Sequence, residues 1–167
     1  MKIALISIDG NGVYNLKNMS FLSKLGNNGY NKIMKTTFPS LTDSVHSSLM
    51  TGMYPKHHGI VENGYYDRIN GEKVNFYEED VVLNPHKHIR SKTLVDYLRE
   101  TDLKTASVSA YMMPPYSGTD MRIFPPFYKE NLFHEYGKDL EKDKWVVESS
   151  KYIAESFDPD VMFIHFC

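Results

Sequence analysis

Apolar runs along the chain predict four β-strands. The N-terminal stretch KIALISID (2–9) is almost continuously apolar and ends in Asp9, a pattern typical of a buried strand in a parallel sheet. KTASVSA (104–110) predicts another strand, and YNKIMKTTF (30–38) favours one as well. DVMFIHF (160–166) is so apolar that we expect it inside the sheet rather than at its edge.

Helical patterns separate these strands. The spacing of apolar residues and the positions of capping residues predict helices over 15–25, 42–51, 91–98 and 141–156, and a small hairpin around 68–74. Strands that alternate with helices form a mostly parallel sheet with helices on both of its faces. The sequence therefore predicts an α/β fold with three layers, α/β/α.

Composition and charge add limits on partners and location. The chain has 167 residues, enough for one domain, and a net charge of −2 with acids and bases mixed along its length. This charge gives no attraction to a nucleic-acid polymer or an anionic membrane, so neither is expected as a partner. Cys167 is the only cysteine, and the sequence shows no signal-peptide pattern, so we expect a cytoplasmic location.

The last predicted strand bears on the extent of the chain. In α/β proteins the functional loops follow the C-terminal ends of central strands, whereas this sequence stops at Cys167, directly after 160–166. We therefore expect residues 1–167 to be the N-terminal part of a single domain, truncated before its C-terminal part. The alternative is a natural domain that ends on a central strand.

Three polar residues stand at positions where such a fold places its chemistry. Asp9 follows the first strand, where it either starts a turn or serves a site at the carboxyl edge of the sheet. Thr42 stands at the predicted start of a helix. It is either a capping hydroxyl or a group placed for phosphoryl chemistry, because helix N-termini bind phosphate. Asn63 is either a turn residue or an amide donor to a phosphoryl oxygen.

Residue types alone give no complete catalytic set. Among the seven histidines, His57 and His58 are adjacent, and His86 and His88 have no carboxylate partner nearby in the sequence. DGNG (9–12) is neither a dinucleotide-binding fingerprint nor a P-loop, and the sequence contains no Gly-x-Ser-x-Gly motif. These nucleotide-binding and serine-hydrolase patterns are therefore excluded.

Three motifs taken together resemble a known family. ISIDG (6–10), FPSLTDSVHSSLMTGMYPKHHGI (38–60) and ENGYYD (62–67) are similar, in this order, to motifs of the type I phosphodiesterase / nucleotide pyrophosphatase family. This family belongs to the alkaline phosphatase superfamily, together with the phosphonoacetate hydrolases. The likeness is strong over residues 3–67 and continues more weakly to residue 166.

The resemblance implies roles for the three polar residues. Asp9 would be a zinc ligand, Thr42 would be the nucleophile and a further metal ligand, and Asn63 would help to hold a phosphoryl oxygen. Thr37 competes with Thr42 for the role of nucleophile, because it precedes a Phe-Pro pair, as the nucleophile does in nucleotide pyrophosphatases. Thr42 alone has the family's spacing, nine residues before Thr51 and twenty-one before Asn63. The remaining ligands of the two zinc ions would lie beyond residue 167.

The same resemblance implies an activity. We expect the whole protein to be a zinc-dependent phosphodiesterase or nucleotide pyrophosphatase that acts through a phosphothreonine on a small phosphate diester, nucleotide or phosphonate. A complete site would hold two Zn²⁺ ions. Because most of their ligands would lie beyond residue 167, the isolated 167-residue chain would be inactive. The alternatives are a phosphonate or phosphate monoester hydrolase of the same superfamily, and a non-catalytic α/β module that binds an anion.

Overall fold

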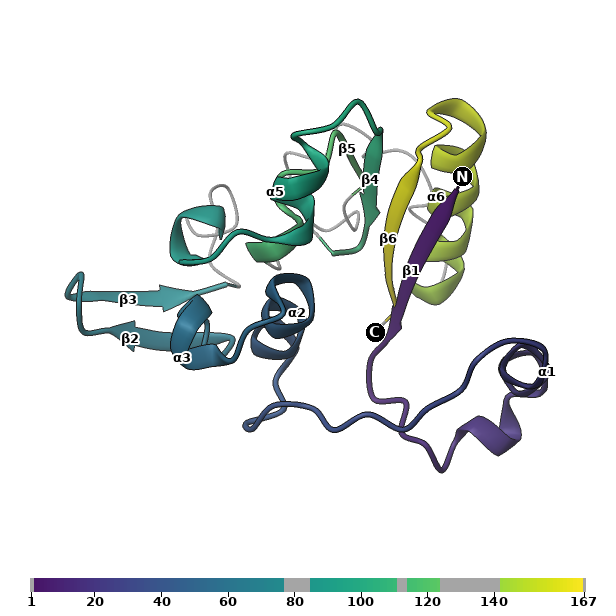
Figure 1. Cartoon of the computed structure of the whole chain (residues 1–167), viewed down its shortest axis with the longest axis horizontal. Coiled ribbons are helices and arrows are strands. Elements are labelled where there is room, and N and C mark those ends of the chain that lie inside the picture. Colours follow the sequence, from purple (N-terminus) through teal and green to yellow (C-terminus); the bar gives the residue numbers. More distant parts are fainter. Residues whose placement is uncertain (1, 77–84, 111–113, 124–141, 167) are drawn as a thin grey trace.

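A four-stranded parallel sheet forms the centre of the computed structural model, which describes residues 2–76, 85–110, 114–123 and 142–166 (Figure 1). The strands lie in the order β1 (Ile3–Ile8), β6 (Val161–Phe166), β4 (Thr105–Val108) and β5 (Met121–Ile123). Because β6 pairs with β1 on one side and with β4 on the other, the prediction that this strand lies inside the sheet is confirmed.

Strand β1 forms an edge of the sheet within the described part of the chain. Its parallel register with β6 runs from Ile3 opposite Val161 to Ile8 opposite Phe166. The side chains of Ile3 and Ile6 are 47% and 56% exposed. The prediction of a buried strand over 2–9 is therefore right for the strand and wrong for its burial, since an apolar run does not reveal how many neighbours a strand has.

Helix α6 (Lys142–Ser156) covers one face of the sheet. Trp145, Val146 and Ile153 are buried in one apolar cluster with Val108 of β4 and Ile164 of β6. The predicted helix over 141–156 is confirmed, and its apolar positions are the ones that face the sheet. Burying one such large side chain stabilises the fold by about 1.5–3 kcal/mol.

The opposite face carries α2 (Thr42–Thr51), α5 (Leu94–Leu98) and the 3-10 helix η3 (Pro114–Tyr116). Met50 of α2, Val95 of α5 and Tyr116 of η3 pack against Phe163 of β6. Helices therefore cover both faces, as the three-layer prediction required. Helix α5 starts at a capping box of Thr93 with Asp96, rather than at Ser91 as the sequence suggested.

The segment between β1 and α2 differs from the sequence predictions. The helix predicted over 15–25 is divided into η1 (Leu16–Asn18) and α1 (Ser20–Asn28), because the backbone of Met19 is not helical. The stretch 30–38 pairs with no described strand, so the strand predicted there is wrong. Figure 1 shows α1 lying apart from the central sheet, with an extended segment running from it to α2.

A small second unit follows α2. Helix α3 (Pro55–His58) leads into an antiparallel hairpin of β2 (Gly64–Asp67) and β3 (Glu72–Asn75), and the 3-10 helix η2 (Pro85–His88) follows. The hairpin predicted around 68–74 is confirmed. Ile60, Val74, Phe76 and Ile89 form a separate apolar cluster beneath it. No helix among the described residues is both long enough and apolar enough to cross a bilayer.

Candidate functional site

Asp9 lies at the carboxyl end of β1. Its backbone N–H donates to the carbonyl of Phe166 at 2.9 Å, which continues the ladder between β1 and β6 by one residue. Its carboxylate oxygen Oδ1 accepts the N–H of Gly10 at 2.7 Å, as a turn residue would. The second carboxylate oxygen faces another element, α2. Asp9 therefore starts the turn, as one alternative expected, and its second oxygen lies at the sheet edge beside Thr42, while its role as a metal ligand stays a prediction.

Thr42 is the first residue of α2 and not its N-cap. The N-cap position belongs to Leu41, and no side chain caps this helix. The Thr42 hydroxyl instead donates to Oδ2 of Asp9 at 3.3 Å, across 33 residues of sequence. The capping alternative for Thr42 is therefore wrong. The hydroxyl lies in the first turn of the helix, where backbone N–H groups lack intrahelical acceptors and the helix dipole favours an anion.

Asn63 is bound to the same helix end. Its side-chain oxygen Oδ1 accepts the backbone N–H of Asp43 at 3.0 Å, and its own carbonyl accepts the N–H of Phe76 at 3.0 Å. Asn63 is therefore more than a turn residue, because it ties the hairpin to the first turn of α2. With its oxygen on the helix, the donor that this amide presents is its NH₂ group.

Asp43 was not singled out by sequence reasoning, although it follows Thr42 directly. Its side chain is 4% exposed, and this burial raises the pKa of its carboxyl to about 7. Buried acids with a raised pKa are frequent at functional sites. The pattern in the sequence, an Asp at the second position of a helix, gave no sign of burial because that position usually faces solvent.

Two buried histidines support α2. His46 lies between Ser7 of β1 and Tyr116 of η3, with its Nε2 3.0 Å from the Ser7 hydroxyl and its Nδ1 2.7 Å from the Tyr116 hydroxyl. Burial, together with nearby His165 and against the opposing effect of Asp9, lowers the pKa of His46 to about 4. The spacing of four residues between His46 and Thr42 was the signal available in the sequence.

The second histidine, His58, pairs with Ser48 without forming a catalytic dyad. The N–H of Ile60 donates to Nδ1 of His58 at 3.1 Å, so Nε2 of the neutral ring carries the hydrogen. Nε2 donates to the Ser48 hydroxyl at 2.9 Å, and that hydroxyl donates to the carbonyl of Ser44. A nucleophilic serine needs an imidazole that accepts its proton. This pair therefore holds α2 and α3 together and does no chemistry.

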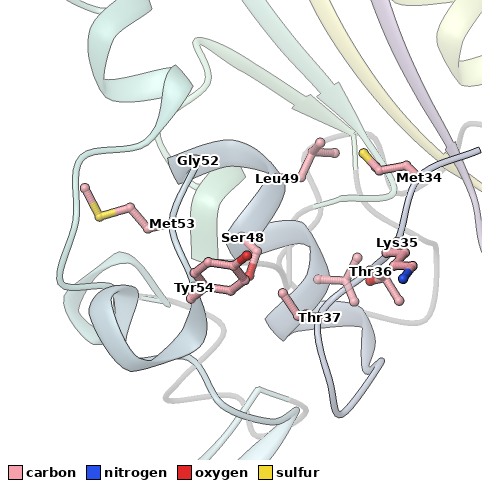
Figure 2. Close-up of a pocket in the computed structure, with 10 residues that line it drawn as sticks. Met34, Lys35, Thr36, Thr37, Ser48, Leu49, Gly52, Met53 and Tyr54 are labelled. Atoms are coloured by element: carbon pink, nitrogen blue, oxygen red, sulfur yellow. The ribbon is translucent and has the colours of Figure 1, made fainter. Parts of the chain in front are cut away.

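Thr37, the threonine that directly precedes the Phe38-Pro39 pair, lies in a different place. It lines a cavity of about 390 Å³ between the 34–37 segment and the outer side of α2 (Figure 2). The wall of this cavity is largely apolar and includes Met34, Leu49, Met53 and Tyr54. The buried Thr37 hydroxyl has no hydrogen-bond partner among the described residues. Thr42, and not Thr37, is the threonine that the fold brings to Asp9.

The oxygens of Asp9 and Thr42 could hold one metal ion. A carboxylate and a hydroxyl 3.3 Å apart, at an exposed sheet edge, offer two oxygen ligands of the kind that zinc accepts. Within the described residues no group of three or more His, Cys, Asp or Glu side chains gathers at one point. The residues present therefore fit part of a zinc coordination sphere, and a complete one needs further ligands.

The family of the chain follows from its sequence. Residues 3–167 match the type I phosphodiesterase / nucleotide pyrophosphatase family, and the chain belongs to this family of the alkaline phosphatase superfamily. It is 47% identical over 47 residues to ectonucleotide pyrophosphatase/phosphodiesterase family member 1 of Rattus norvegicus, which is 28% of the chain and 5% of that protein. It is 32% identical over 74 residues to an uncharacterised pyrophosphatase/phosphodiesterase of Schizosaccharomyces pombe, which is 42% of the chain and 15% of that protein.

Solved structures share the fold over nearly the whole chain. Phosphonoacetate hydrolase from Sinorhizobium meliloti, solved with phosphonoacetate, superimposes with a TM-score of 0.74 at 18% identity, over 99% of this chain and 46% of that one. Murine ectonucleotide pyrophosphatase / phosphodiesterase 5 gives a TM-score of 0.72 at 15% identity, over 99% and 43%. The chain thus spans less than half the length of these proteins, and a smaller part of the curated relatives.

Proposed function

We propose that the chain is the N-terminal part of a single catalytic domain of a zinc-dependent phosphodiesterase or nucleotide pyrophosphatase, with Thr42 as the nucleophile. The observation that carries this proposal is the Thr42 hydroxyl in the first turn of α2, directed at Asp9 at the end of β1. Membership of a family of phosphodiesterase- and pyrophosphatase-type hydrolases supports it. So does a fold neighbour, murine ectonucleotide pyrophosphatase / phosphodiesterase 5, described as inactive when one threonine is alanine.

The reaction begins at the Thr42 hydroxyl. Its oxygen attacks phosphorus, the bond between phosphorus and the leaving-group oxygen breaks, and the phosphoryl group is transferred to Thr42. The hydroxyl proton points at Oδ2 of Asp9, the acceptor that this chain offers. Water then attacks the phosphothreonine, the bond from phosphorus to the Thr42 oxygen breaks, and that oxygen regains a proton. When bound at Asp9 and Thr42, zinc would supply Lewis-acid activation and positive charge at the developing oxyanion.

Donors at the end of α2 hold the phosphoryl oxygens. The helix dipole and the backbone N–H groups of the first turn, apart from that of Asp43, attract the anion, and the Asn63 NH₂ group adds a neutral donor. The bond from Asp43 N–H to Asn63 Oδ1 fixes the plane of this amide before substrate arrives. A donor held in place costs no reorganisation when charge develops in the transition state.

The substrates are small molecules that carry a phosphate diester, a nucleotide pyrophosphate or a phosphonate. Two fold neighbours were solved with phosphonoacetate and with AMP, and these ligands support this substrate class. A diester reacts by loss of an alcohol or a nucleotide, a phosphonate by cleavage of a carbon–phosphorus bond. The leaving group therefore separates diesterase from phosphonate hydrolase. The cytoplasmic location expected from the sequence stays a prediction.

The experiment is a substrate panel with the longest polypeptide that the source gene encodes, loaded with zinc. Thymidine 5′-monophosphate 4-nitrophenyl ester, 4-nitrophenyl phosphate and phosphonoacetate are compared, and Thr42→Ala is measured alongside. The diesterase proposal requires the first substrate to be preferred and Thr42→Ala to abolish its turnover. A preference for phosphonoacetate would favour the phosphonate hydrolase alternative instead. Zinc-independent anion binding without turnover would favour the non-catalytic module.

A further inference from the structure

Among the described residues, two side-chain hydrogen bonds join α2 to β1 and to Asp9, which follows β1, and only one of them belongs to the site proposed above. At the exposed end the Thr42 hydroxyl donates to Oδ2 of Asp9 at 3.3 Å. Deeper in the protein, Nε2 of His46 lies 3.0 Å from the hydroxyl of Ser7. Thr42 and His46 are four residues apart, on one side of the helix, and Ser7 and Asp9 are two residues apart, on one face of the strand.

The dimensions of helix and strand let both contacts form together. Four residues of an α-helix rise about 6.0 Å, and two residues of a β-strand rise about 6.6 Å. The placement of α2 that puts Thr42 beside Asp9 therefore also puts His46 beside Ser7. A shift of the helix by one residue would turn the Thr42 hydroxyl by about 100° away from Asp9.

Burial makes the deeper contact the firmer of the two. The side chain of His46 is 6% exposed and that of Tyr116 is 1% exposed, and the Tyr116 hydroxyl lies 2.7 Å from Nδ1 of His46. The ring of His165, in β6, meets the His46 ring edge to face at 5.1 Å between centroids. The His46 imidazole is thus fixed by β1, η3 and β6, whereas the contact between Thr42 and Asp9 is open to water. Buried polar groups with satisfied partners specify one arrangement of the surrounding elements.

We propose that His46 is a positioning residue for the nucleophile. Its hydrogen bond to Ser7 sets the register of α2 on β1 and so holds the Thr42 hydroxyl beside Asp9. This inference rests on the proposed function of Thr42, but its geometric part concerns only the chain's own elements. His46 acts through Ser7 and is assigned no contact with substrate or metal.

Two substitutions of His46 distinguish the contact made by Nε2 from the contact made by Nδ1. The amide of His46→Gln reaches the position of Nε2 and can keep the bond to Ser7, whereas that of His46→Asn reaches only the position of Nδ1, beside Tyr116. Ser7→Ala removes the same bond from the other side with a smaller change. The control is His57→Asn, because His57 is an exposed histidine.

The structural readout is the separation between Oγ1 of Thr42 and Oδ2 of Asp9 in crystal structures of the chain and its variants. We expect this separation to exceed hydrogen-bond distance in Ser7→Ala and His46→Asn and to stay as in the wild type in His46→Gln and His57→Asn. An unchanged separation in Ser7→Ala would overturn the proposal, and this variant decides the question if His46→Asn does not fold.

The kinetic readout uses the longest encoded polypeptide with zinc and the nitrophenyl diester. Ser7→Ala and His46→Asn are expected to lower kcat about 100-fold with little change in KM, because the nucleophile is misplaced while substrate contacts remain. His46→Gln should recover most of this loss. Rates that follow only the thermal stability of the variants, with Gln no better than Asn, would contradict a positioning role. If Thr42→Ala proves fully active, the proposed function fails, and the structural readout still decides the register.

Discussion

At the scale of single residues, the sequence could place Asp9 and Thr42 but not their contact. Asp9 ends an apolar strand and Thr42 starts a helix, and both patterns are local. The bond between them spans 33 residues and depends on how α2 packs on the sheet, which no local pattern records. Thr37 has the same residue type and a similar context, yet the fold directs it to a cavity on the outer side of α2.

The first prediction compares these two threonines. In the longest encoded polypeptide with zinc, Thr42→Ala should lower kcat on the nitrophenyl diester about 1000-fold or more, because the attacking oxygen is removed. Thr42→Ser keeps a hydroxyl and should retain measurable turnover. Thr37→Ala should leave kcat unchanged. Loss of activity in Thr37→Ala, with Thr42→Ala active, would assign the nucleophile to the other threonine.

The second prediction concerns His58 and pH. Burial lowers the pKa of His58 from 6.5 to about 4 in the folded protein, and His57 adds to the shift. Because the unfolded state binds the proton more tightly, the neutral folded ring stabilises fully above pH 6.5, and this contribution is lost as pH falls toward 4. The stability advantage of wild type over His58→Gln should therefore shrink by about 2–3 kcal/mol across this range.

Urea unfolding at several pH values measures this difference, and subtracting the variant from the wild type cancels other titrating groups. His57→Gln is the matched control, since His57 is exposed. It removes only the smaller contribution of His57 to the His58 shift, so most of the pH dependence of the wild type should remain. The wild type could instead exceed His58→Gln in free energy of unfolding by the same amount at every pH. That result would mean that the His58 ring is not held neutral by the bonds to Ile60 and Ser48.

At the scale of elements, the strength of the hydrophobic pattern decided which predictions were right. Strands β4 and β6 and helix α6 have strong local patterns and were predicted. Strand β5 has three residues and was missed, because its place comes from pairing with β4. The stretch 30–38 has strand-forming residues but pairs with no described strand, and propensity cannot supply a neighbour.

The third prediction concerns the turn that ends β1. Gly10 has a φ of +65°, and its N–H binds Oδ1 of Asp9, whereas Gly12 has no such conformation. A Cβ at either position would meet nothing within 4 Å, so only the backbone conformation differs. Gly10→Ala should therefore lower the free energy of unfolding by about 1–2 kcal/mol.

Gly12→Ala is the matched control and should change this free energy by less than about 0.5 kcal/mol. Chemical denaturation of both variants measures the two values. Equal effects of the two substitutions would show that the left-handed conformation at Gly10 does not matter for stability. Such a result would also weaken the case that this turn holds the Asp9 carboxylate in place.

At the scale of the whole molecule, the sheet and its two helical layers bring the site together. The carboxyl end of β1 meets the N-terminal end of α2, and the hairpin reaches the same helix end through Asn63. The order of strands was not predictable, since β1 and β6 are neighbours that lie at opposite ends of the sequence. The described residues supply a hydroxyl, one carboxylate and an amide, which make up part of the zinc site proposed above.

The fourth prediction follows from this incomplete ligand set. The isolated 167-residue chain should show no diester hydrolysis at any zinc concentration, because one carboxylate and one hydroxyl bind zinc weakly. Activity of the purified chain with zinc, compared with its own Thr42→Ala variant, checks this. Turnover that depends on Thr42 would mean that this chain completes the site by itself.

The most direct test of the account is to trap the phosphorylated enzyme. The longest encoded polypeptide is mixed with zinc and the nitrophenyl diester, quenched in acid within the first turnover and digested with trypsin. The relevant peptide, residues 36–56, contains four threonines, Thr36, Thr37, Thr42 and Thr51, and fragmentation in the mass spectrometer assigns the modified residue. We expect phosphorus on Thr42 with thymidine still esterified to it, because 4-nitrophenolate is the group that leaves. A phosphoryl group on another residue, or turnover without any phosphorylated intermediate, would contradict the account.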